Sequence, residues 1–313
     1  MTTNRRANIA SGNTPITFRD NMTTRLARFL MIPLLAFVCL PGARAVDTPE
    51  HGEPLRILLV AGGCCHDYAT QKDLLKAGIE SRINAEVTVA YNPSGSTDTR
   101  FDVYGSANWA DKYDVILHDE CSAKVTDIAY VNRILDAHRR GKPAVNIHCA
   151  MHCYRWGDYR DPVKLGAENA GWYEMIGLQS TGHGPQSPLD VSYVDADHPL
   201  TKGLKNWTTI KEELYNNIQV FGTAHVLASG KQMQPPNKRA LKENPDAKPK
   251  QSEAAIAWTN EYGPNKTKVF STSLGHNNET VGDDRYLDLV VRGLLWTTGN
   301  LSDDGSPIPA YAK

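Results

Sequence analysis

A continuous apolar run, Leu55–Ala61, constrains the fold more than any other feature of this 313-residue chain. The run lies between Pro54 and the pair Gly62-Gly63, and it lacks the alternation of a half-buried strand. Such runs are typical of strands buried on both faces of a parallel sheet. Strand-like and helix-like segments then alternate as far as residue 148, which predicts an α/β fold with helices covering the sheet.

The remaining elements follow from apolar spacing and from turn residues. Strands are predicted at residues 55–61, 86–90, 111–117, 144–148, 189–194, 224–229, 254–259 and 268–273. Helices are predicted at residues 70–83, 125–140, 168–176 and 282–297. Residues 230–251 are rich in Lys, Pro, Asn and Gln, which predicts an exposed loop.

The first 45 residues have the layout of a secretory signal peptide. Arg25 and Arg28 precede an apolar stretch at residues 29–40, and Ala43-Arg44-Ala45 has the small residues of a cleavage site. The stretch is too short for a membrane span, and Met22 is an alternative start. We expect a periplasmic or secreted protein cleaved near Ala45. A linker at 46–54, a domain at 55–300 and a tail at 301–313 complete the predicted organisation.

Charge and cysteine content narrow the class of protein further. The net charge is −1 and no basic stripe is present, so we expect no nucleic-acid partner. Loss of the leader with Cys39 leaves an odd number of the six cysteines, so at least one would be unpaired or bound to something else. Because a bridge between adjacent cysteines is strained, we expect Cys64 or Cys65 to pair, if at all, with Cys121, Cys149 or Cys153.

Polar side chains gather where three predicted strands end. Thiols, imidazoles and carboxylates occur at residues 64–66, 118–121 and 148–153. Because ligands bind at the carboxyl edge of an open parallel sheet, these groups predict a functional site at that edge.

Several segments resemble the ThuA-like family, which is named for trehalose utilisation. They are RILLVAGGCCHDY, KYDVILHD, GKPAVNIHCAMH, STGHGPQSPLDVSYVDADHPLTKGL, KEELYNN and KVFSTSLGHNNET, and the resemblance covers about residues 55–300. It implies a flavodoxin-like three-layer α/β/α sandwich with a mostly parallel sheet, as in class I glutamine amidotransferases. It also implies a role in carbohydrate metabolism, on oxidised (keto) disaccharides.

Histidines next to glycines are the main catalytic candidates. His66 follows Gly62-Gly63, His183 lies between two glycines, and His276 follows Gly275 after the last strand. The family carries histidines at the positions of His66 and His183. We expect His276, His148 and His66 to be catalytic and His183 to bind substrate, whereas His198 is expected to build a turn.

The cluster at residues 148–153 is compatible with a metal, because imidazole and thiolate are good zinc ligands. If an α-helix starts after His148, then His148 and His152 share a face. A divalent metal such as zinc, held by His148, His152 and His66, is therefore one interpretation. A metal-free polar site and a purely structural cluster, with Cys149 and Cys153 paired, remain open.

Carboxylates, a thiol and aromatic rings complete the candidate set. Glu213 is expected to act as a base or to orient a histidine, whereas Glu212 is expected to be a solvated charge. By resemblance to the amidotransferases, Cys149 is a candidate nucleophile with His276 and Glu279 as partners, although its flanking glycines are absent. Trp156, Tyr159, Trp172 and Tyr173 are candidates to stack on sugars or to close the core, and Asp119 is a further substrate-binding candidate.

These observations predict an exported hydrolase or lyase that acts on a disaccharide or keto-glycoside through a histidine-rich site. A small carbohydrate is the expected partner, without nucleic acid and without a membrane span in the mature chain. Two alternatives stay open, which are a non-catalytic carbohydrate-binding protein and a hydrolase that uses Cys149 as its nucleophile.

Overall fold

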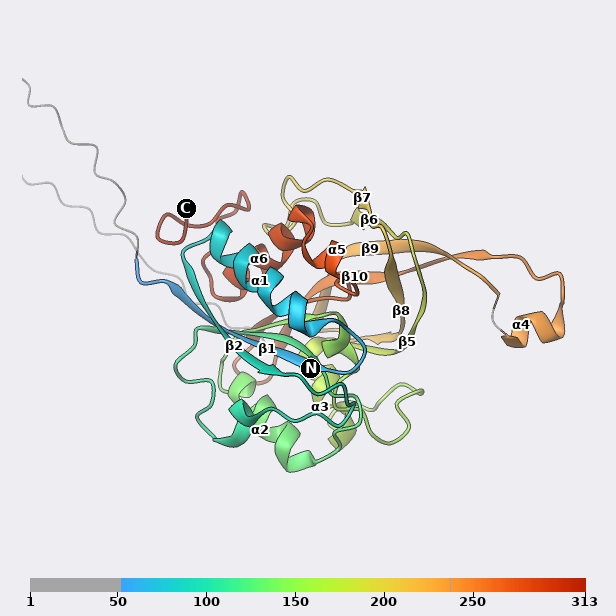
Figure 1. Ribbon diagram of the computed structural model, residues 1–313, viewed down its shortest axis with the longest axis horizontal. Coiled ribbons are helices and arrows are strands. Elements are labelled where there is room, and N and C mark those ends of the chain that lie inside the picture. Colours follow the sequence, from blue (N-terminus) through green and yellow to red (C-terminus); the bar gives the residue numbers. More distant parts are fainter. Residues whose placement is uncertain (1–51, 237) are drawn as a thin grey trace, which may run out of the picture. The chain divides into compact units, whose positions relative to one another are not determined.

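The computed structural model describes residues 52–236 and 238–313, and their central sheet has the strand order β2-β1-β3-β4-β11-β10-β9-β6-β7 (Figure 1). One half of this sheet is parallel. It consists of β2 (Ala85–Asn92), β1 (Leu55–Gly63), β3 (Val115–Cys121), β4 (Ala144–Ile147) and β11 (Thr267–Thr272). The carboxyl ends of these strands therefore meet at a single edge.

The other half is antiparallel and adds further strands beside β11. It consists of β10 (Lys250–Tyr262), β9 (Ala224–Gln234), β6 (Asp190–Tyr193) and β7 (Trp207–Thr208). A separate small sheet pairs β5 (Leu178–Ser187) with β8 (Glu212–Val220). Neither β5 nor β8 was expected from the sequence, because glycines and polar residues hide the strand pattern of both segments.

Helices cover both faces of the parallel half, as Figure 1 shows. Alternate residues of β1 face opposite cores: Ile57 and Leu59 pack with α1 (Tyr68–Arg82) and α6 (Asp284–Thr297), which lie on one face. Leu58 and Val60 belong to the core on the other face, beneath α2 (Ile128–Arg139) and α3 (Gly171–Ile176). This alternation explains the unbroken apolar run of β1 and confirms the three-layer α/β fold.

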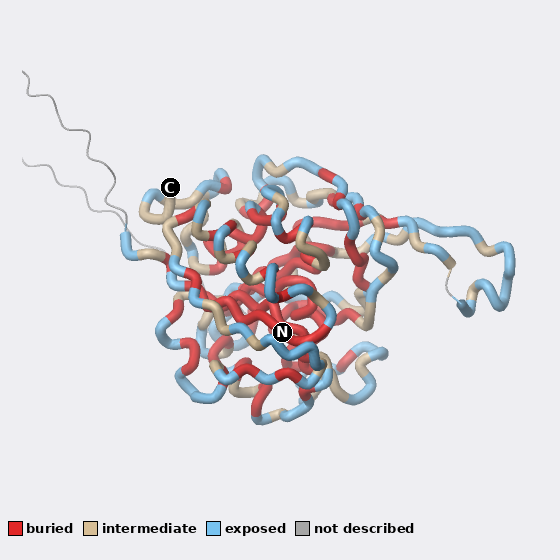
Figure 2. The backbone as a smooth tube through the Cα atoms, in the orientation of Figure 1, coloured by how far each residue is buried: buried red, intermediate tan, exposed pale blue. Residues whose placement is uncertain are grey.

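The segment predicted as an exposed loop at residues 230–251 contains regular structure. Strands β9 and β10 continue into it as a ribbon, with Gln234 paired to Lys250, and α4 (Lys238–Glu243) lies beyond the ribbon (Figure 1). Its surface is largely exposed (Figure 2). Backbone hydrogen bonds between paired strands need no apolar side chains, which explains why composition alone suggested a loop.

The two ends of the chain differ in what the structure describes. The predicted signal peptide at residues 1–45 lies outside the described residues. At the other end, the tail pairs through Ala312 with Ile83 in an isolated β-bridge, and Tyr311 packs against the core. Among the described helices, none has both the length and the apolar character needed to cross a membrane.

Candidate active site

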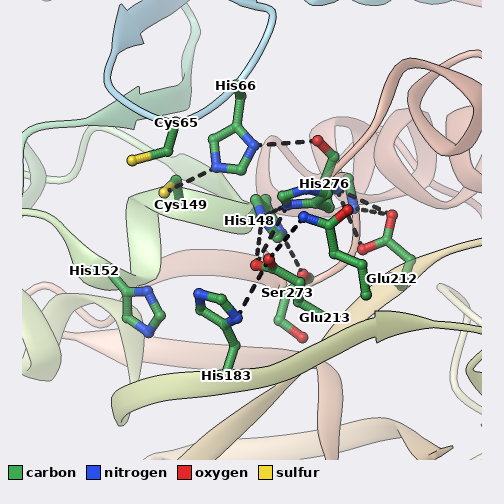
Figure 3. A network of polar contacts seen from close by, with 12 residues as sticks. Cys65, His66, His148, Cys149, His152, His183, Glu212, Glu213, Ser273 and His276 are labelled. Atoms are coloured by element: carbon green, nitrogen blue, oxygen red, sulfur yellow. Dashed lines mark hydrogen bonds and ion pairs between the residues drawn. The ribbon is translucent and has the colours of Figure 1, made fainter. Parts of the chain in front are cut away.

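Three histidines from distant parts of the chain meet at the carboxyl edge of the parallel strands. His66 follows β1, His148 follows β4 and His276 follows β11. One ring nitrogen of each lies within 4.8 Å of those of the other two. Figure 3 shows the three rings converging. We call His66, His148 and His276 the histidine triad.

Positive φ angles shape the loops that carry two of these histidines. Gly62 has a φ angle of +139°, and a Cβ there would lie 2.2 Å from the Asn92 carbonyl oxygen. Gly63 has a φ angle of +97°, and a Cβ there would lie 2.3 Å from the Cys121 carbonyl oxygen. Only glycine therefore allows β1 to end so close to its neighbours. His148 itself has a φ of +41°, a left-handed conformation that is unusual outside glycine.

Backbone carbonyls fix the orientation of two of the rings. Nδ1 of His148 donates to the Ser273 carbonyl at 2.7 Å, and Nδ1 of His66 donates to the His276 carbonyl at 3.2 Å. In a neutral ring this leaves Nε2 as an acceptor. A histidine held in this way through one nitrogen is typical of a metal ligand or a general base.

The carboxylate of Glu213 lies among several imidazoles. Its Oε2 is 3.3 Å from Nδ1 of His276 and 3.7 Å from Nε2 of His148. Its Oε1 is 3.3 Å from Nδ1 of His183, whose side chain is half-exposed at the rim of the pocket. A single carboxylate thus links two members of the histidine triad to His183.

The surroundings shift the pKa values of the three histidines in different directions. Burial, and then the proximity of His276, lowers the pKa of His66 to about 4. Burial, and then His66, likewise lowers the pKa of His148. Burial also opposes the charge on His276, but its hydrogen bond to Glu213 and the charge of that carboxylate outweigh burial and raise its pKa. At neutral pH His66 and His148 are therefore neutral.

Glu212 differs from its predicted role as a solvated charge. Its side chain is fully buried, and its Oε1 accepts hydrogen bonds from the backbone N–H of His276 at 3.0 Å and of Gly275 at 3.3 Å. Burial raises the pKa of Glu212 to about 7, partly offset by these bonds. Because side chains alternate along a strand, Glu212 and Glu213 face opposite sides of β8, and each contacts the His276 loop from its own side.

His152 does not join the histidine triad, contrary to the predicted ligand set. Residues His148–His152 form a 3₁₀ helix, in which residues four apart lie about 120° from each other instead of sharing a face. Nε2 of His152 lies 3.0 Å from Oγ of Ser180, and its ring stacks on Tyr215 at 4.3 Å. His276 takes the position that the prediction gave to His152.

Cys149 lies beside the pocket in a setting unsuited to a free thiolate. Its Sγ is 3.2 Å from Nε2 of His66 and 2.6 Å from Sγ of Cys121. The contact with Cys121, followed by burial, raises the pKa of the Cys149 thiol. Glu279, its suggested second partner, is exposed on α5 (Asn278–Val281), and the carboxylate that contacts His276 is Glu213.

The other substrate-binding candidates lie away from the pocket lining, which includes His183, Arg155 and Tyr215. Trp156 packs against the core beneath α2, and the Tyr159 ring contacts the guanidinium groups of Arg155 and Arg160. Asp119 is buried, which raises its pKa. Its strand β3 runs on to Cys121, four residues beyond the predicted end, so Asp119 lies within the sheet.

The structure also decides the predictions on cysteine pairing and on two of the aromatic side chains. Cys64 and Cys65 form a disulfide with each other, so the expectation that adjacent cysteines do not bridge is wrong, and Cys121, Cys149 and Cys153 are free. Trp172 and Tyr173 are buried in the core.

The pocket next to the histidine triad is small and opens toward a larger groove. Its volume is about 240 Å³, and the adjoining groove of about 940 Å³ runs between the small sheet and the β9–β10 ribbon. Gly182, His183 and Tyr215 line both. A ligand seated against the triad therefore has room to extend past His183.

The fold and the pocket define an α/β protein with a central sheet that is parallel in one half and a histidine-rich site at the strand ends. The sequence matches the profile of the ThuA family, described as trehalose utilisation, over residues 56–297. The chain belongs to that family.

Solved structures agree on the fold. A ThuA-like protein from Parabacteroides merdae has a TM-score of 0.54 at 17% identity, covering 83% of this chain and 97% of its own. A ThuA-like protein from Bacteroides uniformis has a TM-score of 0.54 at 14% identity, covering 87% and 99%. No curated protein matches the sequence.

Proposed function

We propose that this protein is a hydrolase or lyase that acts on a disaccharide or keto-glycoside, with a divalent metal such as zinc held by the histidine triad. The observation that carries the proposal is the meeting of three ring nitrogens within 4.8 Å of one another. They lie at the strand edge where α/β sheets bind ligands. Three histidines are a common ligand set of catalytic zinc.

The chemistry of the donor set supports a metal. Imidazole binds a metal in its neutral form, and the lowered pKa values of His66 and His148 keep both rings neutral. The carbonyl partners of their Nδ1 atoms are of the kind that orients metal-bound histidines. Glu213 supplies a negative charge next to the triad, which offsets part of the charge of a cation.

The residues around the triad have separate roles in this proposal. When bound, a divalent metal polarises a substrate oxygen and lowers the pKa of water. Glu213 orients His276 through their 3.3 Å contact. Glu213 also faces Nδ1 of His183 at 3.3 Å, at the rim of the pocket. His183 is therefore placed to exchange a proton with a substrate in the pocket.

The dimensions of the site and the family support a sugar larger than one ring. Pockets for drug-sized ligands occupy about 300–1,000 Å³, so the 240 Å³ pocket suits only part of such a ligand. The adjoining groove, which includes Asn216, Gln234 and Lys250, offers polar groups to the remainder. The family description, trehalose utilisation, favours a disaccharide.

The test combines metal analysis with a substrate screen. Full-length protein would be analysed for metal and assayed with disaccharides and 3-keto glycosides, alongside His148→Ala and His276→Ala. His225→Asn is the matched control, because His225 pairs with Asp195 at the surface. The proposal expects turnover in the native protein and the control, and loss in both triad variants. Full turnover in both triad variants would contradict it.

Each alternative function has its own outcome in this experiment. Sugar binding without product, across several added metals, would favour a carbohydrate-binding protein. The raised pKa of Cys149 makes a cysteine nucleophile the weaker candidate, and activity abolished by Cys149→Ser but not by the triad variants would support it. We also propose export, supported by the leader-like residues 1–45, and N-terminal sequencing of the mature protein tests it.

A further inference from the structure

Four cysteines form a line of sulfur atoms that ends at the histidine pocket. Cys64 and Cys65 are joined by a disulfide. Sγ of Cys64 lies 3.4 Å from Sγ of Cys121, which lies 2.6 Å from Sγ of Cys149. Cys149 in turn faces Nε2 of His66 at 3.2 Å. We call Cys64, Cys65, Cys121 and Cys149 the sulfur line.

The sulfur line runs from solvent to the interior. Cys65 is exposed, whereas Cys64, Cys121 and Cys149 are buried, with exposed fractions of 8%, 2% and 7%. Cys65 is therefore the member most open to an external thiol, and all four cysteines also line the histidine pocket. The far end, Cys149, belongs to the wall of the histidine pocket.

The sheet holds these sulfurs in place. Cys64, Cys121 and Cys149 lie at the ends of the neighbouring strands β1, β3 and β4. The backbone N–H of Cys64 donates to the carbonyl of Cys121 at 3.3 Å, and Gly63 pairs with Cys121 in the β1–β3 ladder. The short Sγ distances are therefore a consequence of strand pairing.

We propose that the sulfur line is a thiol–disulfide exchange relay that moves one disulfide between the surface and the histidine pocket. In the first step, Cys121 attacks Sγ of Cys64. The Cys64–Cys65 bond breaks, a Cys64–Cys121 bond forms, and Cys65 leaves with the proton that Cys121 gives up. In the second step, the small thiolate fraction that the raised pKa leaves at Cys149 attacks Cys121. The Cys64–Cys121 bond breaks, a Cys121–Cys149 bond forms, and Cys64 receives the proton of Cys149.

The two steps conserve electrons, because one disulfide and two thiols are present throughout. The relay leaves Cys64 and Cys65 as a dithiol at the surface, where a small thiol or its disulfide can exchange with exposed Cys65. At the other end, Cys149 no longer offers an S–H to His66. The proposal needs only the cysteines, so it stands or fails separately from the proposed hydrolase or lyase activity.

Disulfide mapping tests the relay. Full-length protein, purified without reductant and held at pH 8, would be quenched with acid, alkylated, digested and analysed by mass spectrometry. We expect three linkages in one population: Cys64–Cys65, Cys64–Cys121 and Cys121–Cys149. In Cys121→Ser, Cys64–Cys65 should be the one linkage of the three that remains. In Cys149→Ser, only Cys121–Cys149 should be lost. Cys153→Ser is the control, because Sγ of Cys153 bonds to backbone groups of Glu120, Ser122 and Cys149 and not to a sulfur of the line.

A trapping variant covers the case in which the exchange equilibrium favours Cys64–Cys65. Cys65→Ser, treated with oxidised glutathione, removes that linkage and should form Cys64–Cys121 or Cys121–Cys149. Circular dichroism establishes that each variant is folded. Cys121 that stays fully alkylatable in both the native protein and folded Cys65→Ser would overturn the proposal, as would protection of these thiols by a bound metal.

Discussion

The buried carboxylate of Glu212 accepts a hydrogen bond from the backbone N–H of His276, with an N–O distance of 3.0 Å. Glu212 and the neighbouring Glu213 therefore hold the same histidine loop from two sides. We predict that Glu212→Ala lowers metal affinity by about 10- to 100-fold, the usual cost of losing an orienting group. Zinc titration of chelator-treated protein measures this. Glu279→Ala, at an exposed glutamate nearby, should bind zinc like the native protein, and equal affinities in both variants would contradict the role of Glu212.

Removal of any member of the histidine triad should weaken the metal site more strongly than loss of Glu212. At a zinc concentration that loads the native protein with on the order of one zinc per chain, we predict a lower zinc content in the variants. His66→Ala, His148→Ala and His276→Ala should each bind less than about half a zinc per chain. Elemental analysis after gel filtration measures the content. His152→Ala should keep its zinc, because Nε2 of His152 contacts Ser180 instead. Loss of zinc in His66→Ala, His148→Ala and His152→Ala, with zinc retained in His276→Ala, would restore the ligand set predicted from sequence.

The lowered pKa of His66 predicts a pH-dependent stability of the metal-free protein. Its folded pKa is about 4, below the ordinary value of 6.5. Between these values the unfolded chain binds more protons, so the free energy of unfolding falls as pH drops from 6.5 toward 4. The contribution of His66 is on the order of 3 kcal/mol at most.

Urea unfolding of chelator-treated protein across this pH range measures the slope. Glu212 contributes with the opposite sign, because its pKa is raised to about 7 and its stabilisation is lost as pH rises. Comparison of the native protein with His66→Asn isolates the contribution of this histidine to the pH dependence of the free energy of unfolding. The variant should show a flatter dependence between pH 4 and 6.5, and identical slopes would argue against a neutral, partly buried His66.

The backbone at the end of β1 should not tolerate a side chain. Gly62→Ala places a Cβ 2.2 Å from the Asn92 carbonyl oxygen at a φ of +139°, so we predict a loss of at least about 2 kcal/mol in the free energy of unfolding. Gly95→Ala, where a Cβ meets nothing within 4 Å, should change stability by less than about 0.5 kcal/mol. Thermal unfolding of both variants tests this, and equal melting temperatures would contradict the close-approach argument.

The sequence predicted the parallel half of the sheet because buried parallel strands leave unbroken apolar runs, as at Leu55–Ala61. It also placed His66, His148 and His276 near one edge, since each follows such a strand. The small sheet escaped prediction because β5 and β8 pair with several register shifts. Irregular pairing of this kind leaves no simple period of two for a sequence to show.

Side-chain roles were harder to predict than strand positions. Glu212 and Glu213 are adjacent and chemically alike, and only the pairing of β8 reveals that one anchors a loop while the other faces the pocket. His152 was predicted on the same face as His148 because an α-helix was assumed. In the 3₁₀ helix that forms instead, residues four apart point in different directions. The Cys64–Cys65 disulfide depends on a local backbone conformation, with φ of +87° at Cys65, that composition does not specify.

The central claim is that the histidine triad, and not the nearby cysteines, holds a metal. X-ray absorption at the zinc edge of zinc-loaded, full-length protein tests this most directly, because zinc–nitrogen distances of about 2.0–2.1 Å differ from zinc–sulfur distances of about 2.3 Å. We predict one zinc with imidazole nitrogen ligands and no sulfur. A sulfur shell, or no stoichiometric zinc at all, would contradict the account.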